Sequence, residues 1–321
     1  MGQAALPIVD VQAIYSDDES ALRSLGKHLI EQCETWGLFP VCGHGLEPAL
    51  LDAVFAAAHE FHALPLDAKM AVVVDERHFH RGYIPLPPLP AEIKPGQALP
   101  DRSTAFALMH EMAADDPAAL AGGMLQAANQ WPAELPELKT TALRFQQALS
   151  DLARRLLRAF AAGFDLPLDF FAPSFAKPTT FLRLVYYPPI PTDAPPELFS
   201  ASAHADSGFL TLLAQDGCGG LQVRDKHGQW IAVPPQPGSL VLNVADFFAR
   251  WSGDRLHSAR HRVRNQSGQV RYSLPFFFDP DLDAVLDPLP ASGHPAISYR
   301  RYLLDRMAAA QAAATPQGGY R

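Results

Sequence analysis

Two kinds of hydrophobic spacing divide the chain. In the first half, apolar residues recur every three or four positions over about 21–35, 48–64 and 138–163, which is the spacing of amphipathic helices. After Pro178, short β-prone runs follow one another, separated by Gly-Gly and Pro-Pro turns. Closely spaced runs of this kind are typical of an antiparallel sandwich or barrel. The pattern therefore predicts a mostly β core with flanking helices.

The remaining segments complete a plan for one domain. Strands are expected over 6–11 and 36–42, and Gly163 is expected to cap the longest helix. The proline-rich stretch over 78–100 is irregular, and loops of this length are more often functional or mobile than idle. Because no linker separates the halves, we expect a single domain. It has a helix-rich N-terminal part over 1–165, a β core over 178–280 that carries the site, and a C-terminal helix over 296–314, with a disordered tail after Thr315.

Composition narrows the possible partners. The chain has 34 acidic and 26 basic residues, a formal charge of −8, which argues against binding to nucleic acid. Most arginines between 250 and 271 are expected to be solvated. Cys33, Cys42 and Cys218 lack the spacing of a metal site and indicate reduced thiols. No signal peptide and no membrane-spanning apolar run is found. We expect a soluble cytoplasmic protein whose partner is a small molecule; its oligomeric state is not predicted.

One short motif points to a metal. His204 and Asp206 flank Ala205 just before the apolar run that starts at Phe209. In an extended chain, side chains two positions apart point to the same face, so a divalent ion can bind both. Because three-residue matches often arise by chance, the motif needs a third ligand downstream.

Four histidines follow Asp206. His227 lies in a turn and His294 in a Pro/Gly loop, where solvated side chains are expected. His257 precedes a strand and has no partner that the sequence can place. His261 begins a strand of its own and is the best candidate for the third ligand.

A hairpin would bring His261 to further polar residues. If the turn over 266–268 is a three-residue loop with Gly268 left-handed, Val263 faces Arg271 and His261 faces Ser273. All four side chains then share one face of a single sheet. A two-residue loop would place Arg271 and Ser273 on the opposite face, so the prediction depends on the turn type.

The residue types indicate iron chemistry. Two imidazoles and one carboxylate form the 2-His-1-carboxylate facial triad, which suits non-heme Fe(II) and leaves three positions open. An arginine such as Arg271 pairs bidentately with a carboxylate, and Ser273 can add a hydrogen bond. A pocket with both features would bind a metal-chelating dicarboxylate.

The chain resembles the isopenicillin N synthase-like family of Fe(II)- and 2-oxoglutarate-dependent oxygenases along nearly its whole length. In this order, the motifs that carry the resemblance are Leu6-Pro7-Ile8-Val9-Asp10, Cys33-Glu34-Thr35-Trp36-Gly37-Leu38-Phe39, Gly43-His44-Gly45, Arg81-Gly82-Tyr83, Asn129-Gln130-Trp131-Pro132, Leu182-Arg183-Leu184-Val185-Tyr186-Tyr187-Pro188-Pro189, His204-Ala205-Asp206, Asp246-Phe247-Phe248-Ala249-Arg250-Trp251-Ser252, Ser258-Ala259-Arg260-His261-Arg262-Val263 and Arg271-Tyr272-Ser273-Leu274-Pro275-Phe276-Phe277.

The resemblance implies a double-stranded β-helix, or jelly roll, with flanking helices. It implies iron ligation by His204, Asp206 and His261, and binding of the cosubstrate carboxylate by Arg271 and Ser273. The family tyrosine near the cosubstrate matches Tyr187, although many members carry Asn where this chain has Val185. The implied reaction uses Fe(II), 2-oxoglutarate and dioxygen, hydroxylates or desaturates a small organic substrate, and releases succinate and CO2.

Further roles are expected for residues around these motifs. His44 also falls in a family motif but is interpreted as structural. Apolar strand residues such as Phe276 and Phe278 are candidates to shield the pocket, although core packing would explain them equally well.

Three alternatives stay open at this point. An oxidase of the isopenicillin N synthase type would need no 2-oxoglutarate and would use Arg271 and Ser273 to hold a substrate carboxylate. A non-catalytic ligand-binding protein would keep the fold without turnover. A zinc hydrolase is less favoured, because no His-Glu-x-x-His or comparable general-base arrangement is found.

Overall fold

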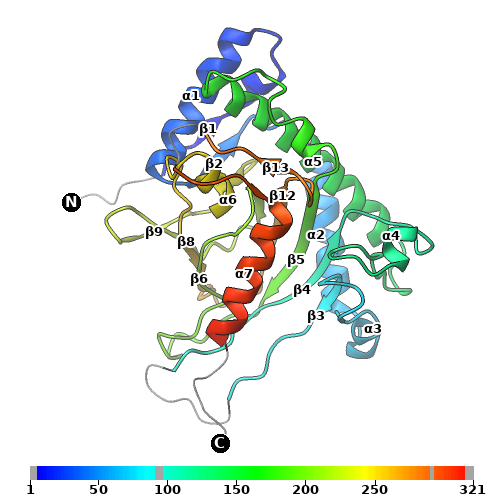
Figure 1. The fold of residues 1–321 in the computed structure, drawn as a ribbon. Helices are drawn as coiled ribbons and strands as arrows, with labels where there is room; N and C mark the ends of the chain where they lie inside the picture. Colours follow the sequence, from blue (N-terminus) through cyan, green and yellow to red (C-terminus); the bar gives the residue numbers. More distant parts are fainter. Residues whose placement is uncertain (1–5, 91–96, 290–292, 315–321) are drawn as a thin grey trace, which may run out of the picture.

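Two β-sheets form the centre of the molecule, and helices lie outside them (Figure 1). The computed structural model describes residues 6–90, 97–289 and 293–314. The larger sheet has, in spatial order, β1 (Val9–Asp10), β2 (Leu38–Cys42), β10 (Leu240–Val244), β7 (Leu210–Gln215), β12 (Arg271–Asp279), β5 (Thr179–Tyr187), β4 (Thr104–Met109) and β3 (Gly82–Ile84). The smaller sheet has β6 (Ala201–His204), β11 (His261–Val263), β8 (Leu221–Arg224) and β9 (Trp230–Ala232).

Alternation along the strands gives the larger sheet two different faces. On β5, Leu182 and Leu184 belong to the core that the helices cover. Val185 and Tyr187 belong to a second cluster, shared with Val223 of the smaller sheet. Successive side chains of a strand point to opposite faces, so one face of β5 packs on helices and the other lines the space between the sheets.

The long helices follow the apolar spacing of the first half. They are α1 (Glu19–Thr35), α2 (Pro48–Ala63) and α5 (Glu137–Gly163). The other helices are η1 (Gln12–Tyr15), α3 (Leu66–Met70), α4 (Pro117–Leu120), η2 (Pro173–Phe175), α6 (Asp246–Trp251) and α7 (Tyr299–Ala314). In Figure 1, α1 and α5 lie side by side at one end of the molecule, and α7 crosses in front of the strands.

The role expected of Gly163 as a helix cap is wrong. It is the last residue of α5, and the left-handed residue beyond the helix is Asp165, with a φ of 58°. A Cβ atom on Gly163 would collide with the backbone of Gly26, and one on Gly26 would collide with the carbonyl group of Ala159. Gly163 therefore allows close approach of α1 and α5.

The hairpin expected between β11 and β12 does not form. β11 pairs with β6 and β8, whereas β12 pairs with β5 and β7 in the other sheet. Gly268 is left-handed as expected, with a φ of 77°. Before it, Asn265 donates to the carbonyl oxygens of Tyr187 (3.1 Å) and Gln269 (2.8 Å). The turn therefore carries the chain from the smaller sheet to the larger one. There β12 lies between β5 and β7, just as β11 lies between β6 and β8 in the smaller sheet.

The structure contains short strands that the sequence analysis did not predict, in the irregular stretch over 78–100 and before the C-terminal helix. The irregular stretch over 78–100 contains β3, which with β4 extends the larger sheet at one edge. Its residues 91–96 and the tail after Thr315 lie outside the described residues. Two short strands, β13 (Val285–Leu286) and β14 (Ile297–Ser298), precede α7. Among the described helices, none combines the length and apolar character needed to cross a bilayer.

Candidate active site

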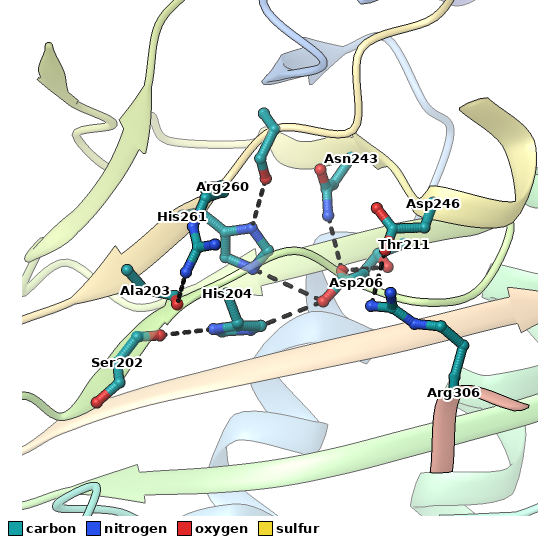
Figure 2. Close-up of polar contacts among 11 residues, drawn as sticks. Ser202, Ala203, His204, Asp206, Thr211, Asn243, Asp246, Arg260, His261 and Arg306 are labelled. Atoms are coloured by element: carbon teal, nitrogen blue, oxygen red, sulfur yellow. Dashed lines mark hydrogen bonds and ion pairs between the residues drawn. The ribbon is translucent and has the colours of Figure 1, made fainter. Parts of the chain in front are cut away.

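The expected metal ligands meet where two neighbouring strands begin and end. His204 is the last residue of β6, and His261 is the first residue of β11, directly opposite it in the antiparallel pair. Their ring centroids are 4.3 Å apart. Asp206 follows β6 by two residues, and its carboxylate points toward both rings (Figure 2). Strand pairing thus unites residues that are far apart in the sequence.

Backbone carbonyl groups orient both imidazoles. Nδ1 of His204 lies 2.7 Å from the Ser202 oxygen, and Nδ1 of His261 lies 3.2 Å from the Ala259 oxygen. A proton on Nδ1 satisfies each contact and leaves the Nε2 lone pair free for a metal. Each Nε2 atom is 3.7 Å from Oδ1 of Asp206. An ion with ligand bonds of about 2.1 Å can bridge atoms up to roughly 4.2 Å apart, so one ion fits between them.

Asp206 is also held by neutral donors. Its Oδ2 atom accepts hydrogen bonds from the Thr211 hydroxyl (2.6 Å) and from Nδ2 of Asn243 (2.7 Å) (Figure 2). Its backbone oxygen accepts from the Asp246 nitrogen at the start of α6 (2.8 Å). These contacts use one carboxylate oxygen and leave Oδ1 for a metal.

Thr211 and Asn243 are functional candidates that the sequence analysis missed. Thr211 on β7 pairs with Asn243 on β10, and both side chains reach the Asp206 carboxylate. The available signal was a polar residue at an inward position of an apolar strand, as in Leu240-Val241-Leu242-Asn243-Val244. Buried polar groups of this kind need a partner, and here the partner is a candidate ligand.

The three candidate ligands differ in their exposure to solvent. Asp206 and His261 are buried, while the side chain of His204 keeps 49% of its exposure. Burial lowers the pKa of the His261 imidazole, and this effect outweighs the opposing effect of the Asp206 carboxylate. The neutral imidazole, which is the form that binds metals, is therefore favoured. Of the described residues, only His204, Asp206 and His261 gather as a potential metal-binding group.

Arg271 occupies the other end of the same space. It is fully buried, and its Nη2 atom donates to Oε1 of Gln215 at 3.0 Å. Its Nε and Nη1 atoms have no partner within the described chain. An unsatisfied buried donor costs roughly 1–3 kcal/mol, and more when it is charged. The guanidinium group thus has two free donors that could bind an anion from outside the protein.

Tyr187 and Ser273 complete this end. The guanidinium carbon of Arg271 lies 4.8 Å from the centroid of the Tyr187 ring, and the Tyr187 hydroxyl is 3.1 Å from Oγ of Ser273. Arg271 pairs with Tyr187 across β12 and β5, and Ser273 pairs with Val185. The structure brings together the three residues that the sequence indicated, but through this strand pair and not through the expected hairpin.

A cavity of about 370 Å³ joins the two ends. It contains both histidines and Asp206 as well as Arg271, Ser273 and Tyr187, so residues of β11 and β12 meet across the space between the sheets. Pro275 and Phe277 line the cavity, whereas Phe276 and Phe278 pack in the core under the helices. Of the two roles considered for Phe276 and Phe278, core packing is the one observed, because the alternation of β12 turns them away from the cavity.

The other histidines lie elsewhere. His227 is exposed in its turn, as expected. His294, expected to be solvated, is half-buried, with Nε2 at 2.9 Å from the Asp254 carboxylate. His44 is buried, and its Nε2 atom lies 3.1 Å from the Gly238 oxygen, which agrees with the structural role expected of it.

Comparison with known proteins identifies the family. The model of the 2OG-Fe(II) oxygenase superfamily matches residues 178–280, and that of the non-haem dioxygenase in morphine synthesis N-terminal region matches residues 6–134. The 2-oxoglutarate-Fe(II) type oxidoreductase hxnY of Emericella nidulans is 37% identical over 90% of this chain and 84% of that protein. The 2-oxoglutarate-dependent dioxygenase citB of Monascus ruber is 36% identical over 90% and 88%.

A solved structure gives the same answer for the fold. A full-length Neurospora crassa protein, crystallised in complex with alpha-KG, aligns with a TM-score of 0.83 and 27% identity, covering 94% of this chain and 96% of that one. The expected jelly roll with flanking helices is confirmed by this likeness. The chain belongs to the 2OG-Fe(II) oxygenase superfamily, and it is an oxidoreductase that uses Fe(II), 2-oxoglutarate and dioxygen.

Proposed function

We propose that His204, Asp206 and His261 are the three protein ligands of Fe(II). Support comes from the convergence of one atom from each residue, all within 4.8 Å of one another. Nitrogen and carboxylate donors in this ratio suit non-heme iron and leave coordination positions for other molecules. The hydrogen bonds that hold Asp206 and both imidazoles prepare the ligands before the ion arrives.

In the same proposal, Arg271 binds the distal carboxylate of 2-oxoglutarate, and Ser273 adds a hydroxyl donor. The observation that carries this assignment is the pair of unpartnered nitrogens on a fully buried arginine in the same cavity as the metal ligands. Tyr187 supports the guanidinium group with its ring and keeps the Ser273 hydroxyl in place.

The reaction proposed for this site is oxidation of a small organic substrate, by hydroxylation or desaturation. When bound, the iron and 2-oxoglutarate activate dioxygen, and the cosubstrate leaves as succinate and CO2. The protein binds 2-oxoglutarate and the substrate and orients them. It also excludes water with apolar walls that include Leu38, Leu213 and Val241. A dry cavity strengthens the electrostatic contacts made inside it.

The experiment that tests this proposal measures dioxygen consumed and succinate formed by the purified protein with Fe(II) and a panel of substrates. Coupled oxidation predicts one succinate for each dioxygen, and uptake that depends on 2-oxoglutarate. Dioxygen uptake without 2-oxoglutarate would instead favour the oxidase alternative, in which Arg271 holds a substrate carboxylate. Binding of 2-oxoglutarate without turnover of any substrate would favour a binding protein.

Two broader expectations accompany the proposal. We infer a single oxygenase domain, supported by the way β1 and β2 of the N-terminal part join the same sheet as β7, β10 and β12. The cytoplasmic location expected from the sparse cysteines stays a prediction; all three thiols are free.

A further inference from the structure

A second arginine enters the cavity between the two ends already described. Arg183 lies on β5, on the same face as Val185 and Tyr187, and pairs with Ala107 of β4. It lines the same cavity as Asp206 and His261. The residue keeps partial exposure, and its Nε atom is fully buried.

This guanidinium group has no partner in the described part of the chain. Its Nε atom is buried without a hydrogen bond, and none of the ion pairs formed there involves Arg183. Burial lowers the pKa of Arg183, but a guanidinium group remains protonated at neutral pH. A buried cation that forms no ion pair is costly, which favours an anion in the cavity.

The nearby acids are already engaged. Asp101 lines the same cavity, but its Oδ1 atom accepts hydrogen bonds from the Ser202 nitrogen (2.8 Å) and hydroxyl (2.6 Å). Asp206 is held by Thr211 and Asn243 and is a proposed iron ligand. The charges of both acids act on Arg183, but neither carboxylate forms an ion pair or a hydrogen bond with it. Its donors are therefore available to a molecule that enters from outside.

That molecule is separate from the anion assigned to Arg271. Arg271 pairs with Tyr187, and Arg183 lies four positions away from Tyr187 on β5. At about 3.3 Å per residue, the two positions are roughly 13 Å apart along the strand. A short dicarboxylate bound at Arg271 leaves Arg183 available, so the cavity offers two anion-binding positions for two molecules.

We propose that Arg183 binds a carboxylate of the organic substrate and so selects small acids with an apolar body. This inference rests on the proposed function, in which Arg271 is taken by 2-oxoglutarate. The apolar body is indicated by the cavity walls, where Leu213, Pro275 and Phe277 face the space beside Arg183. The size limit follows from a cavity of about 370 Å³, which is at the small end for ligand pockets and must hold both molecules.

The test is a binding experiment that needs no turnover. Protein loaded with Mn(II), which replaces iron, and saturated with 2-oxoglutarate is titrated calorimetrically with three acids and their uncharged amides: benzoate and benzamide, phenylacetate and phenylacetamide, hexanoate and hexanamide. A charge-assisted contact to Arg183 predicts that at least one acid binds about tenfold or more tightly than its amide. Arg183→Gln abolishes that preference, and Arg183→Lys keeps part of it.

Two controls separate this inference from the proposed function. Arg224→Gln changes an exposed arginine of β8 and should leave the preference intact. In Arg183→Gln the affinity for 2-oxoglutarate should stay within about twofold of the wild-type value. If Arg183→Gln loses 2-oxoglutarate instead, Arg183 belongs to the cosubstrate site and the inference is wrong.

The remaining outcomes are equally distinct. If no acid binds better than its amide, or if the preference survives in Arg183→Gln, the inference is overturned while the cosubstrate site stands. If the wild-type protein fails to bind 2-oxoglutarate, the proposed function fails first. A preference for one acid that is lost only in Arg183→Gln supports the inference.

Discussion

The metal end and the arginine end of the cavity differ in how many of their polar groups have hydrogen-bond partners in the protein. At the metal end, each candidate ligand has protein partners: Ser202 and Ala259 orient the histidines, while Thr211 and Asn243 hold Asp206. Arg271 at the arginine end, and Arg183 between the two ends, keep buried nitrogens without partners in the described chain. The candidate metal ligands therefore have hydrogen-bond partners in the protein, whereas the two arginines keep donors that have none.

This difference shows how the two kinds of site are prepared. Metal ligands need a defined orientation, because two imidazoles and a carboxylate must point at one spot before the ion arrives. A buried guanidinium group instead keeps its planar set of donors free for a carboxylate, which supplies the missing charge and hydrogen bonds on binding.

The largest expected effect is loss of the metal. Asp206→Ala and His261→Ala each remove one of the three proposed ligands, so Mn(II) affinity should fall by more than the roughly 10- to 100-fold typical of outer hydrogen-bond partners, and turnover should stop. Calorimetric titration and dioxygen uptake measure the two effects. His227→Ala alters an exposed histidine and should change neither. Wild-type dioxygen uptake in Asp206→Ala or His261→Ala would show that the ligands are elsewhere.

The next effect concerns the arginine end alone. Arg271→Met removes the buried donors proposed for the cosubstrate, so the affinity for 2-oxoglutarate should fall about 10- to 100-fold. Metal affinity measured without 2-oxoglutarate should not change. Arg262→Gln is the matched control, because Arg262 binds Gln222 (2.7 Å) and stacks on Trp230 outside the cavity. An unchanged affinity for 2-oxoglutarate in Arg271→Met would show that other residues bind the cosubstrate.

A smaller effect tests whether the metal end is prepared in advance. Thr211→Val keeps the side-chain shape but removes the hydroxyl that donates to Asp206. Mn(II) affinity should fall about tenfold, the lower range for an outer partner of a ligand. Thr104→Val loses a comparable buried hydrogen bond, to the Ile84 oxygen (2.7 Å), away from the metal. Equal metal affinity in the two variants would contradict the proposed role of Thr211.

The last effect concerns the stability of the fold. Burial raises the pKa of Asp279 to about 6, from an ordinary value of 3.8, although the Phe209 nitrogen and the Tyr299 hydroxyl donate to its carboxylate. A raised pKa in the folded state stabilises the fold below pH 3.8, and this contribution is lost as the pH rises through about 6. The difference corresponds to at most about 3 kcal/mol.

The measurement is the free energy of unfolding of the metal-free protein between pH 4 and pH 7, by urea titration. Asp279→Asn removes the titration, and its stability should decline less across this range. Because the Asp206 charge contributes to the raised pKa of Asp279, Mn(II) should also flatten the pH dependence. Identical profiles for Asp279→Asn and the wild type would rule out this group as the cause.

Much of the fold could be predicted because it follows from local patterns. The apolar spacing of α1, α2 and α5 and the short runs of β5, β7, β10 and β12 are readable within windows of several residues. The sheet that each strand joins, and its neighbours there, could not be predicted from such short windows. Gly268 adopted the expected conformation, yet the chain around it passes to the other sheet and does not turn back in a hairpin.

The same division applies to the site. The residue types and the spacing of His204 and Asp206 indicated a metal, and His261 and Arg271 were found as candidates in the sequence. Arg183 lay within a recognised motif but carried no sign of its isolation, because a missing partner is a property of the surroundings. Thr211 and Asn243 were hidden for the same reason.

By itself, the sequence determined which residues are apolar, which faces of helices and strands are buried, and which side chains can bind a metal or an anion. Only the tertiary structure decided that His261 lies opposite His204 and that Arg271 and Arg183 share a cavity with them. Periodicity acts between residues that are close along the chain. Pairing between distant strands depends on which arrangement of both sheets buries the most apolar surface and satisfies the most backbone groups.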